Sequence, residues 1–224
     1  MIIAAHQSML APQGAPLPYD AEVEYIEING DGTYIDTGVT PHDSPRAVLR
    51  AQYLGTSQST AQTTPIFGRR SYSGGNKYFA FWVRSNTLKM ALNWGTYDTG
   101  WQNQTTDKTA FHDFELQSGG GYYDGTNFRS VSSGGSIGAW SGEPVVYVGA
   151  VNQLNGGAGE NLVTRGVKLR IASFQLWNNS GADLDFSGKA VRVGQVGYLY
   201  DAVSGNLYGN AASSGSFALG PDKT

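Results

Sequence analysis

Short stretches of alternating apolar and polar residues recur along the chain from Tyr19 onward. Two of the first, "EVEYIEI" and "GTYIDTGV", flank the turn sequence Asn29-Gly30-Asp31-Gly32. Alternation over four to eight residues is typical of a half-buried strand, and an Asn-Gly turn between two such runs is a strong hairpin signal. The pattern therefore predicts that these two stretches pair as a β-hairpin.

The stretch "NKYFAFWVRS" is apolar at every second position on both sides. One set of alternate positions is Tyr78, Ala80 and Trp82, and the other is Phe79, Phe81 and Val83. A strand that is apolar on both faces is typical of one covered on both sides. We therefore expect this strand inside a packed sandwich.

The longest alternating stretch is "VKLRIASFQLW". Strict alternation predicts that Val167, Leu169, Ile171 and Ser173 face one way and that Lys168, Arg170, Ala172 and Phe174 face the other. The dipeptide Asp124-Gly125 in "GYYDGTNFRSV" predicts a two-residue turn. In total the pattern predicts about a dozen strands and no helix, which indicates a single all-β domain built as an antiparallel two-sheet sandwich.

The first 18 residues differ from this pattern, because Pro12, Pro16 and Pro18 oppose both helix and sheet pairing. Residues 1–18 are interpreted as an extended N-terminal arm, and residues 19–224 as the folded domain. The apolar residues of the arm, through which it would dock onto a partner or another copy of the chain, are Ile2, Ile3, Met9 and Leu10. The alternative is a frayed terminus.

Composition narrows the classes of function. The chain has 224 residues, 31 of them glycine, no cysteine and a net charge of −3. Without cysteine it forms no disulfide and no thiolate metal site. It has no basic stripe that would follow phosphates and no apolar run long enough to span a bilayer, so neither nucleic-acid binding nor membrane insertion is expected.

Several segments resemble the concanavalin-like (laminin-G-like) jelly-roll modules of phage virion proteins and of surface proteins of gut bacteria. They are "VEYIEINGDGTYIDTGV", "IFGRR", "FAFWVRSNTLKMALNWG", "VKLRIASFQLWNN" and "GYLYDAVSGNLYGNAASSGSFALGPD". The resemblance covers about Tyr19 to Asp222 and implies a concanavalin-like jelly-roll sandwich. Such modules serve as lectins, hydrolases, adhesion modules or shells, so the fold does not assign an activity.

The leading hypothesis is a non-enzymatic phage virion structural protein, a capsid or tail decoration or a fibre-like adhesin. The arm would anchor it to other virion proteins or to copies of itself, and the jelly roll would lie on the virion surface. "MIIAAHQSML" lacks the features of a secretory signal, and a virion protein assembled in the host cytoplasm needs none. The alternative is a carbohydrate-binding or adhesion module on a bacterial cell surface, and the least favoured reading is a glycoside hydrolase.

Candidate catalytic groups are few. Hydrolysis of a glycoside needs two carboxylates about 5–10 Å apart. Asp113 and Glu115 share a strand face beside His112, but a solvated strand face accounts for them better. Glu22 and Glu24 share a face near the start of the domain, where the resemblance implies an outer hairpin. No catalytic residue is therefore assigned.

The stretch "NWGTYDTGWQNQTTDK" carries aromatic residues among polar ones, with almost no aliphatic residue to cover them. Trp94 is interpreted as structural. An exposed aromatic face stacks on sugar C–H groups while amides and carboxylates bond the hydroxyls. The candidate glycan-binding residues are Tyr97, Asp98, Trp101, Gln102 and Asn103. The alternative is that Trp101 packs against the sandwich edge or in a subunit interface.

A cofactor is not expected, although the resemblance leaves a calcium ion at the rim open. Three aspartates would be its candidate ligands, with no spacing that singles them out: Asp98, Asp107 and Asp124.

Overall fold

The computed structural model describes residues 16–30, 32–56, 63–71, 77–84, 89–98, 100, 102–105, 107–131, 137, 144–154, 161–164 and 167–224. At 56, 63, 97–98, 103–105 and 161–164 this description is of the main chain only. The proposed docking residues of the arm, Ile2, Ile3, Met9 and Leu10, lie outside the described residues, and so does Trp101.

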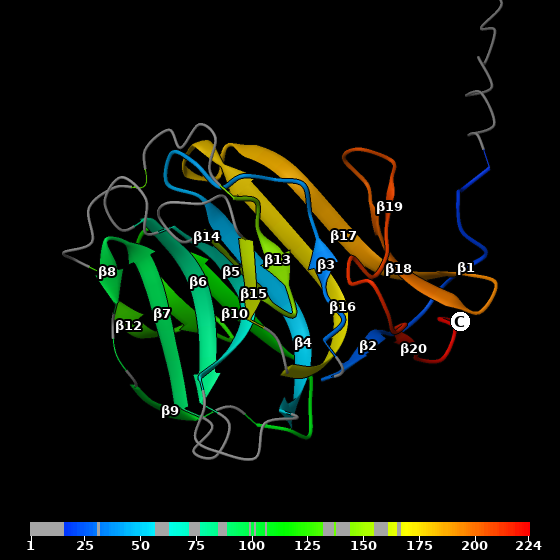
Figure 1. Ribbon diagram of the computed structural model, residues 1–224, viewed down its shortest axis with the longest axis horizontal. Helices are drawn as coiled ribbons and strands as arrows, with labels where there is room; N and C mark the ends of the chain where they lie inside the picture. The colour runs from blue at the N-terminus through cyan, green and yellow to red at the C-terminus, as the bar shows by residue number, and fades with distance from the viewer. Residues whose placement is uncertain are drawn as a thin grey trace, which may run out of the picture.

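The described chain forms two β-sheets (Figure 1). The first has 11 strands. Eight of them lie side by side in this order: β12 (Thr126–Ser130), β11 (Gly120–Tyr123), β10 (His112–Gln117), β4 (Arg46–Thr56), β16 (Val167–Asn178), β17 (Asp183–Val193), β18 (Val196–Asp201) and β19 (Leu207–Tyr208). The other three are β1 (Ala21–Glu22), which pairs with β17, and β2 (Ile26–Asn29), which pairs with both β16 and β20 (Ala218–Leu219). The second sheet has nine strands. Six of them lie side by side in this order: β15 (Asn161–Thr164), β14 (Val151–Leu154), β5 (Thr63–Ser71), β6 (Lys77–Arg84), β7 (Lys89–Gly95) and β8 (Tyr97–Asp98). In addition, β9 (Gln102–Thr105) pairs with β7, and β13 (Tyr147–Val148) pairs with both β5 and β3 (Ile35–Asp36).

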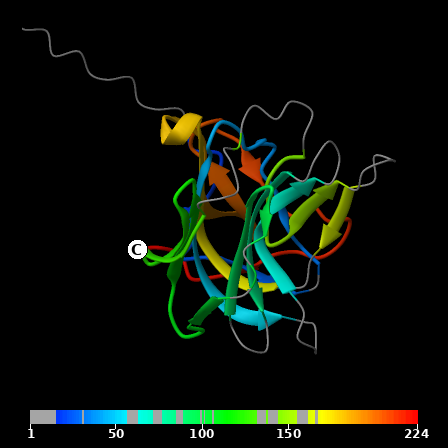
Figure 2. The ribbon, with the colours of Figure 1, turned by 90° about the vertical axis from the view of Figure 1, so that its left-hand side faces the viewer.

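The two sheets face each other as the layers of a sandwich (Figure 2). Phe67 of β5 lies at the centre of the core, with its ring centroid 5.8 Å from that of Phe81 on β6 and 5.5 Å from that of Phe174 on β16. Aromatic side chains bury large apolar areas and favour such tilted contacts. The prediction of an all-β, two-sheet sandwich is confirmed. All the described strand pairs are antiparallel except β14 with β5, which is parallel.

The predicted hairpin at Gly30 is wrong. β2 pairs with β16 and β20 in the 11-stranded sheet, whereas β3 pairs with β13 in the nine-stranded sheet. The turn therefore carries the chain from one layer to the other. Gly30 and Gly32 have φ values of +76° and +95°, which glycine adopts without strain. A turn sequence specifies a local reversal of the chain, but it does not specify the pairing partner of the strand on either side of the turn.

The alternation predicted for β16 holds only as far as Ile171. The register against β4 shifts between Ile171 and Ser173, which marks a β-bulge. Beyond the bulge the two faces exchange, so Phe174 and Leu176 are buried in the core. Ser173 and Phe174 therefore face the opposite sides from those predicted, because one additional residue reverses every later side chain.

The prediction for β6 is confirmed, because both of its faces are buried. Phe79, Phe81 and Val83 belong to the main core, while Ala80 and Trp82 form a smaller apolar cluster with Ala91 and Val151 on the outer face of the nine-stranded sheet. The turn at Asp124-Gly125 is also confirmed. Both residues have positive φ, +47° and +74°, as a type I′ hairpin turn requires.

The structure divides the strands more finely than the sequence indicated. The described residues form 20 strands, and six of these are only two residues long. The helical content of the described residues is one 3₁₀ turn, Asn179–Gly181, so these residues include no helix that could cross a bilayer.

Candidate functional site

The candidate glycan-binding stretch lies at the edge of the nine-stranded sheet (Figure 1). Tyr97 and Asp98 form β8, and Gln102 and Asn103 begin β9. Both strands pair antiparallel with β7. The structure thus brings the main chain of the predicted residues together at one sheet edge. The side chains of Tyr97, Asp98 and Asn103 lie outside the described part.

The described side chains next to Trp101 show how this edge is held. Gly100 is exposed, has a φ of +63° and has open space around it. The Gln102 amide nitrogen donates to the carbonyl of Gly100 at 3.5 Å, and the Gln102 side-chain oxygen accepts from Arg129 of β12 at 3.5 Å. Gly100 is therefore exposed at this edge, and the contact between Gln102 and Arg129 links the edge to the opposite sheet.

Trp94 is buried, in contrast to the exposed Gly100 at this edge. Its side chain is 1% exposed and its ring packs edge-on against Phe79 at 5.8 Å between centroids. The structural interpretation of Trp94 is confirmed.

Asp113 and Glu115 share a face of β10, as predicted, but each is paired with an arginine of β4. Arg50 donates to Asp113 at 3.2 Å, and Arg46 donates to Glu115 at 2.6 Å. Because each carboxylate has its own cation on the neighbouring strand, the geometry is that of a charged strand face. These two groups do not face each other across a cleft.

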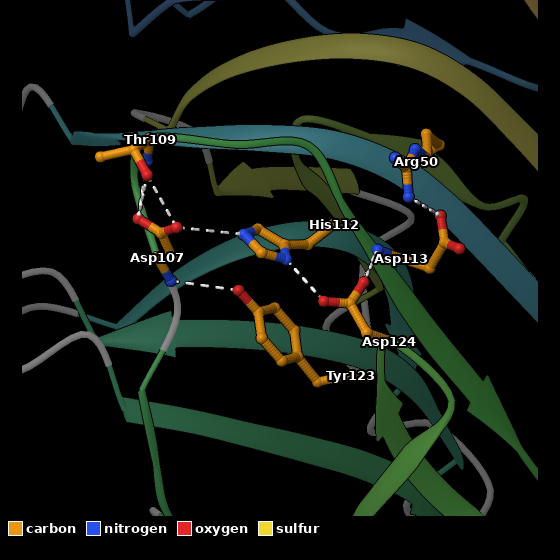
Figure 3. Close-up of polar contacts among 7 residues, drawn as sticks. All are labelled: Arg50, Asp107, Thr109, His112, Asp113, Tyr123 and Asp124. Carbon is orange, nitrogen blue, oxygen red and sulfur yellow. Dashed lines mark hydrogen bonds and ion pairs between the residues drawn. The ribbon is translucent and has the colours of Figure 1, made fainter.

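His112 contacts three residues that lie outside its own strand (Figure 3). Its Nδ1 lies 2.6 Å from a carboxylate oxygen of Asp124, in the β11–β12 turn. Its Nε2 faces Asp107 at 3.6 Å, an ion-pair distance longer than a hydrogen bond. The ring stacks on Tyr123, with 4.7 Å between centroids. We refer to His112, Asp107, Tyr123 and Asp124 as the His112 clasp.

The clasp joins two segments that are distant in sequence. The Tyr123 hydroxyl accepts a hydrogen bond from the main-chain N–H of Asp107 at 3.1 Å, so the segment before β10 is bonded to β11. The Asp107 carboxylate also accepts from the N–H and hydroxyl of Thr109, at 2.8 Å each. Asp124 accepts from the N–H of Asp113 at 2.9 Å. The clasp thus closes one end of the β10–β11 hairpin.

The surroundings of both carboxylates favour their charged forms. Hydrogen bonds from Thr109 are the main reason that the pKa of Asp107 is lowered, with a smaller contribution from His112. For Asp124, burial raises the pKa, but the N–H of Asp113 and the His112 ring, with the positive charge of Arg50, together outweigh burial and lower it.

Two of the three candidate calcium ligands, Asp107 and Asp124, therefore lie on either side of His112. The third, Asp98, belongs to β8 at the sheet edge, and its side chain is outside the described part. The described residues contain no group of three or more His, Asp or Glu side chains placed to bind a metal ion.

The clasp was only partly visible in the sequence. The turn at Ser118-Gly119 joins β10 to β11 in the register that pairs Phe114 with Tyr123, and this register brings His112 close to Asp124 at the end of β11. The approach of Asp107 depends on how the chain returns from β9 to the other sheet, which no local pattern encodes.

Comparison with known proteins bears on the class of fold. No protein-family model matches the chain, and no curated protein matches it. Its fold is similar to the crystal structure of a candidate carbohydrate-binding protein from Bacteroides ovatus, with a TM-score of 0.59 and 10% sequence identity. The match covers 91% of this chain and 61% of that one, so this chain spans about three-fifths of the length of that structure. At this identity the similarity establishes a shared β-sandwich fold.

Proposed function

We propose that this protein is a non-catalytic carbohydrate-binding module whose glycan site is the edge formed by β7, β8 and β9. The observation that carries the proposal is the pairing of β8 and β9 with β7, which places the two strands that flank Trp101 in the sequence on one sheet edge. The sequence between and within these strands carries the aromatic and polar residue types that recognise sugars, because rings stack on sugar C–H groups while amides and carboxylates bond the hydroxyls. The fold shared with the Bacteroides ovatus protein supports the same class of function.

The absence of catalysis belongs to this proposal, and the ion pairs of β10 support it. Asp113 and Glu115 are each neutralised by an arginine, whereas a glycosidase keeps one carboxyl protonated and one free to attack or to activate water. We expect the protein to bind oligosaccharides without releasing reducing sugar from them. Steady release of reducing sugar by the purified protein would contradict this part of the proposal.

The test is a glycan array followed by titration calorimetry on each glycan bound, with the full chain and the variant Trp101→Ala. We expect Trp101→Ala to weaken binding at least about tenfold, since one stacked aromatic contributes about 0.5–1.5 kcal/mol beyond its buried area. Trp177→Ala is the matched control, because Trp177 is a partly exposed tryptophan of the other sheet. If both variants bind like the unaltered protein, the edge is not the site.

A finer hypothesis is that the module is displayed on a phage particle and docked through residues 1–18. The sequence resemblance of residues 19–222 to virion jelly rolls supports it. The side chain of Leu17, at the end of the arm, is 59% exposed, as an apolar docking residue is before it meets a partner. Light scattering of the full chain and of a chain that begins at Tyr19 tests self-assembly through the arm. A larger mass for the full chain alone supports this docking, and equal masses for both chains count against self-assembly.

A further inference from the structure

A hollow lies at the end of the sandwich far from the β7–β9 edge. Its volume is about 270 Å³ and it lies between the first half of β18 and the segment 209–217. β19 pairs with β18 only at Leu199 and Tyr200, so the Val196–Tyr198 half of β18 is not covered by that strand. Figure 1 shows β18, β19 and β20 on one side of the molecule and β8 and β9 on the other. We refer to this feature as the β18 hollow.

The lining of the β18 hollow indicates the chemistry of its ligand. No charged residue lines it. Its apolar lining residues include Val196 and Phe217, its aromatic one is Tyr198, and its polar ones include three serines, Ser213, Ser214 and Ser216. A phosphate, carboxylate or ammonium ligand would be left there without a counter-charge, which is costly. The lining fits a neutral molecule that has both an apolar face and several hydroxyls.

The hydroxyls around the hollow are available to a ligand. Within the described part of the chain, Tyr198 and these three serines make no side-chain hydrogen bond other than to solvent, and the serines are exposed. Their bonds to a ligand would therefore replace bonds to water and would not break bonds within the protein. A volume of about 270 Å³ is just below the range of drug-sized pockets, so it suits a single sugar ring.

The serine wall is fixed in place before any ligand binds. The Asn210 side-chain nitrogen donates to the carbonyls of Ser214 at 2.8 Å and Gly215 at 3.1 Å, and its oxygen accepts from Ala212 at 3.0 Å. The main-chain N–H of Ala211 donates to the carbonyl of Tyr34 at 2.9 Å, which ties the segment to the body of the sandwich. These bonds use the main chain of the serine segment and leave its side chains free to face solvent.

The Tyr198 ring is also held in place. A Cβ on Gly209 would approach Tyr198 Cε1 to 3.0 Å, so the ring lies directly against the main chain of Gly209. Since Gly209 has no side chain, the ring can approach its main chain this closely, and both residues line the hollow. An aromatic wall facing a row of hydroxyls suits a pyranose, whose C–H face packs on a ring while its hydroxyls bond outward.

We propose that the β18 hollow is a second carbohydrate subsite that takes one neutral pyranose unit. Its ligand class rests on the proposed function, but its residues are separate from those of the β7–β9 edge. A glycan chain held at one end of the module could therefore be accompanied by a second glycan at the other, so that one module would link two chains.

The experiment is protein-observed NMR on the full chain, with amide shifts followed during titration with methyl α-D-glucopyranoside, methyl β-D-galactopyranoside and methyl α-D-mannopyranoside. We expect saturable shifts at amides of 197–198 and 209–217 with at least one of these sugars. Glucuronate and glucose 6-phosphate should bind more weakly, because the hollow offers no positive charge. Equal or tighter binding of the charged sugars at these amides would overturn the proposal.

Two variants and two controls locate the binding. Tyr198→Ala should weaken it about tenfold, the effect of losing one stacked ring. Ser214→Phe should block it by filling the hollow, because the Asn210 bond uses only the main-chain carbonyl of Ser214. Tyr200→Ala, which removes a ring of the same strand that packs on Tyr19, should leave the shifts at 197–198 and 209–217 unchanged. Trp101→Ala should weaken binding at the β7–β9 edge but leave these same shifts unchanged.

The outcomes separate this proposal from the proposed function. Shifts confined to 97–103 would support the edge site and overturn the β18 subsite. Shifts at 209–217 that survive Trp101→Ala, with none at 97–103, would support the subsite and count against the edge. If a folded Ser214→Phe protein binds as tightly as the unaltered protein, the hollow is not the site.

Discussion

The outer faces of the two sheets use the same contact between a cation and an aromatic ring in very different surroundings. On the 11-stranded sheet, the Arg46 guanidinium lies 4.7 Å from the centre of the Trp177 ring, and both side chains are partly exposed. On the nine-stranded sheet, the Arg70 guanidinium lies 5.4 Å from the Trp82 ring, but Trp82 is only 5% exposed. One face is a solvated charged surface, and the other is a second apolar layer.

The polar contacts on the two outer faces differ in the same way. Ion pairs cross neighbouring strands on the 11-stranded sheet: Arg46 with Glu115, Arg50 with Asp113, Arg170 with Glu27 and Lys189 with Glu22. On the nine-stranded sheet, the indole N–H of Trp82 donates to the Asn93 side chain at 2.6 Å within a buried cluster. Buried rings stabilise by area removed from water, whereas exposed ion pairs are screened and contribute little. The nine-stranded sheet should therefore be far more sensitive to substitution on its outer face.

The largest expected effect is that of Trp82→Ala. Removing this buried ring and leaving its Asn93 partner unbonded should lower the free energy of unfolding by about 3–5 kcal/mol. Trp177→Ala, on the exposed face, should cost about 1 kcal/mol. Urea denaturation of both variants measures the two values. Equal losses would show that the two outer faces do not differ in the way their burial indicates.

The next effect is a dependence of stability on acid, carried by the 11-stranded sheet. The pKa values of Glu22 and Asp124 are lowered in the folded protein, Glu22 mainly through its hydrogen bond from Lys189. A lowered folded pKa gives stability that is present above the unfolded pKa and lost as pH falls through the folded value. Stability should therefore fall below about pH 4.

Asp124→Asn tests the contribution of the His112 clasp to that dependence. At pH 7 we expect a loss of about 1 kcal/mol, since the charge-assisted bond to His112 is weakened while the N–H of Asp113 keeps an acceptor. The variant should also lose less stability than the unaltered protein as pH falls. Glu24→Gln is the control, because Glu24 is an exposed carboxylate outside the His112 clasp. Parallel pH profiles for Asp124→Asn and the unaltered protein would contradict the clasp.

Tyr53, on the inner face of β4, predicts an effect at the opposite end of the pH range. Its side chain is buried, its hydroxyl has no hydrogen-bond partner among the described residues, and burial raises its pKa to about 12. A tyrosine that ionises more readily in the unfolded chain destabilises the fold as pH rises from about 10 toward 12. Tyr53→Phe should therefore be about 1 kcal/mol more stable than the unaltered protein at pH 11. At pH 7 the change should be small, and thermal melts at both pH values measure it.

The smallest expected effect is the coupling between Arg46 and Glu115. Although the two atoms lie 2.6 Å apart, Arg46 is 40% exposed, so a double-mutant cycle with Arg46→Ala and Glu115→Ala should give less than about 1 kcal/mol. High salt should reduce that coupling further. A coupling well above this value that persists in salt would mean that the outer face of the 11-stranded sheet is less solvated than its exposure indicates.

Some features of this protein follow from local sequence. The two apolar faces of β6 and the Asp124-Gly125 turn were predicted correctly, because alternation reports burial and a type I′ turn needs residues that tolerate positive φ. The fold class follows from the same signals repeated along the chain. The burial of Trp94 also agrees with its place in a strand of alternating apolar residues.

Other features were decided only by the tertiary structure. The turn at Gly30 is predicted to form a hairpin but connects two sheets, because each strand beside the turn pairs with a strand that is distant in the sequence. The bulge after Ile171 exchanged the faces of β16, since one unpaired residue is enough to reverse a period of two. The His112 clasp and the β18 hollow each bring together residues from different strands and loops. Local sequence set how each segment is extended and which positions avoid water, whereas packing between the two sheets set which side chains meet.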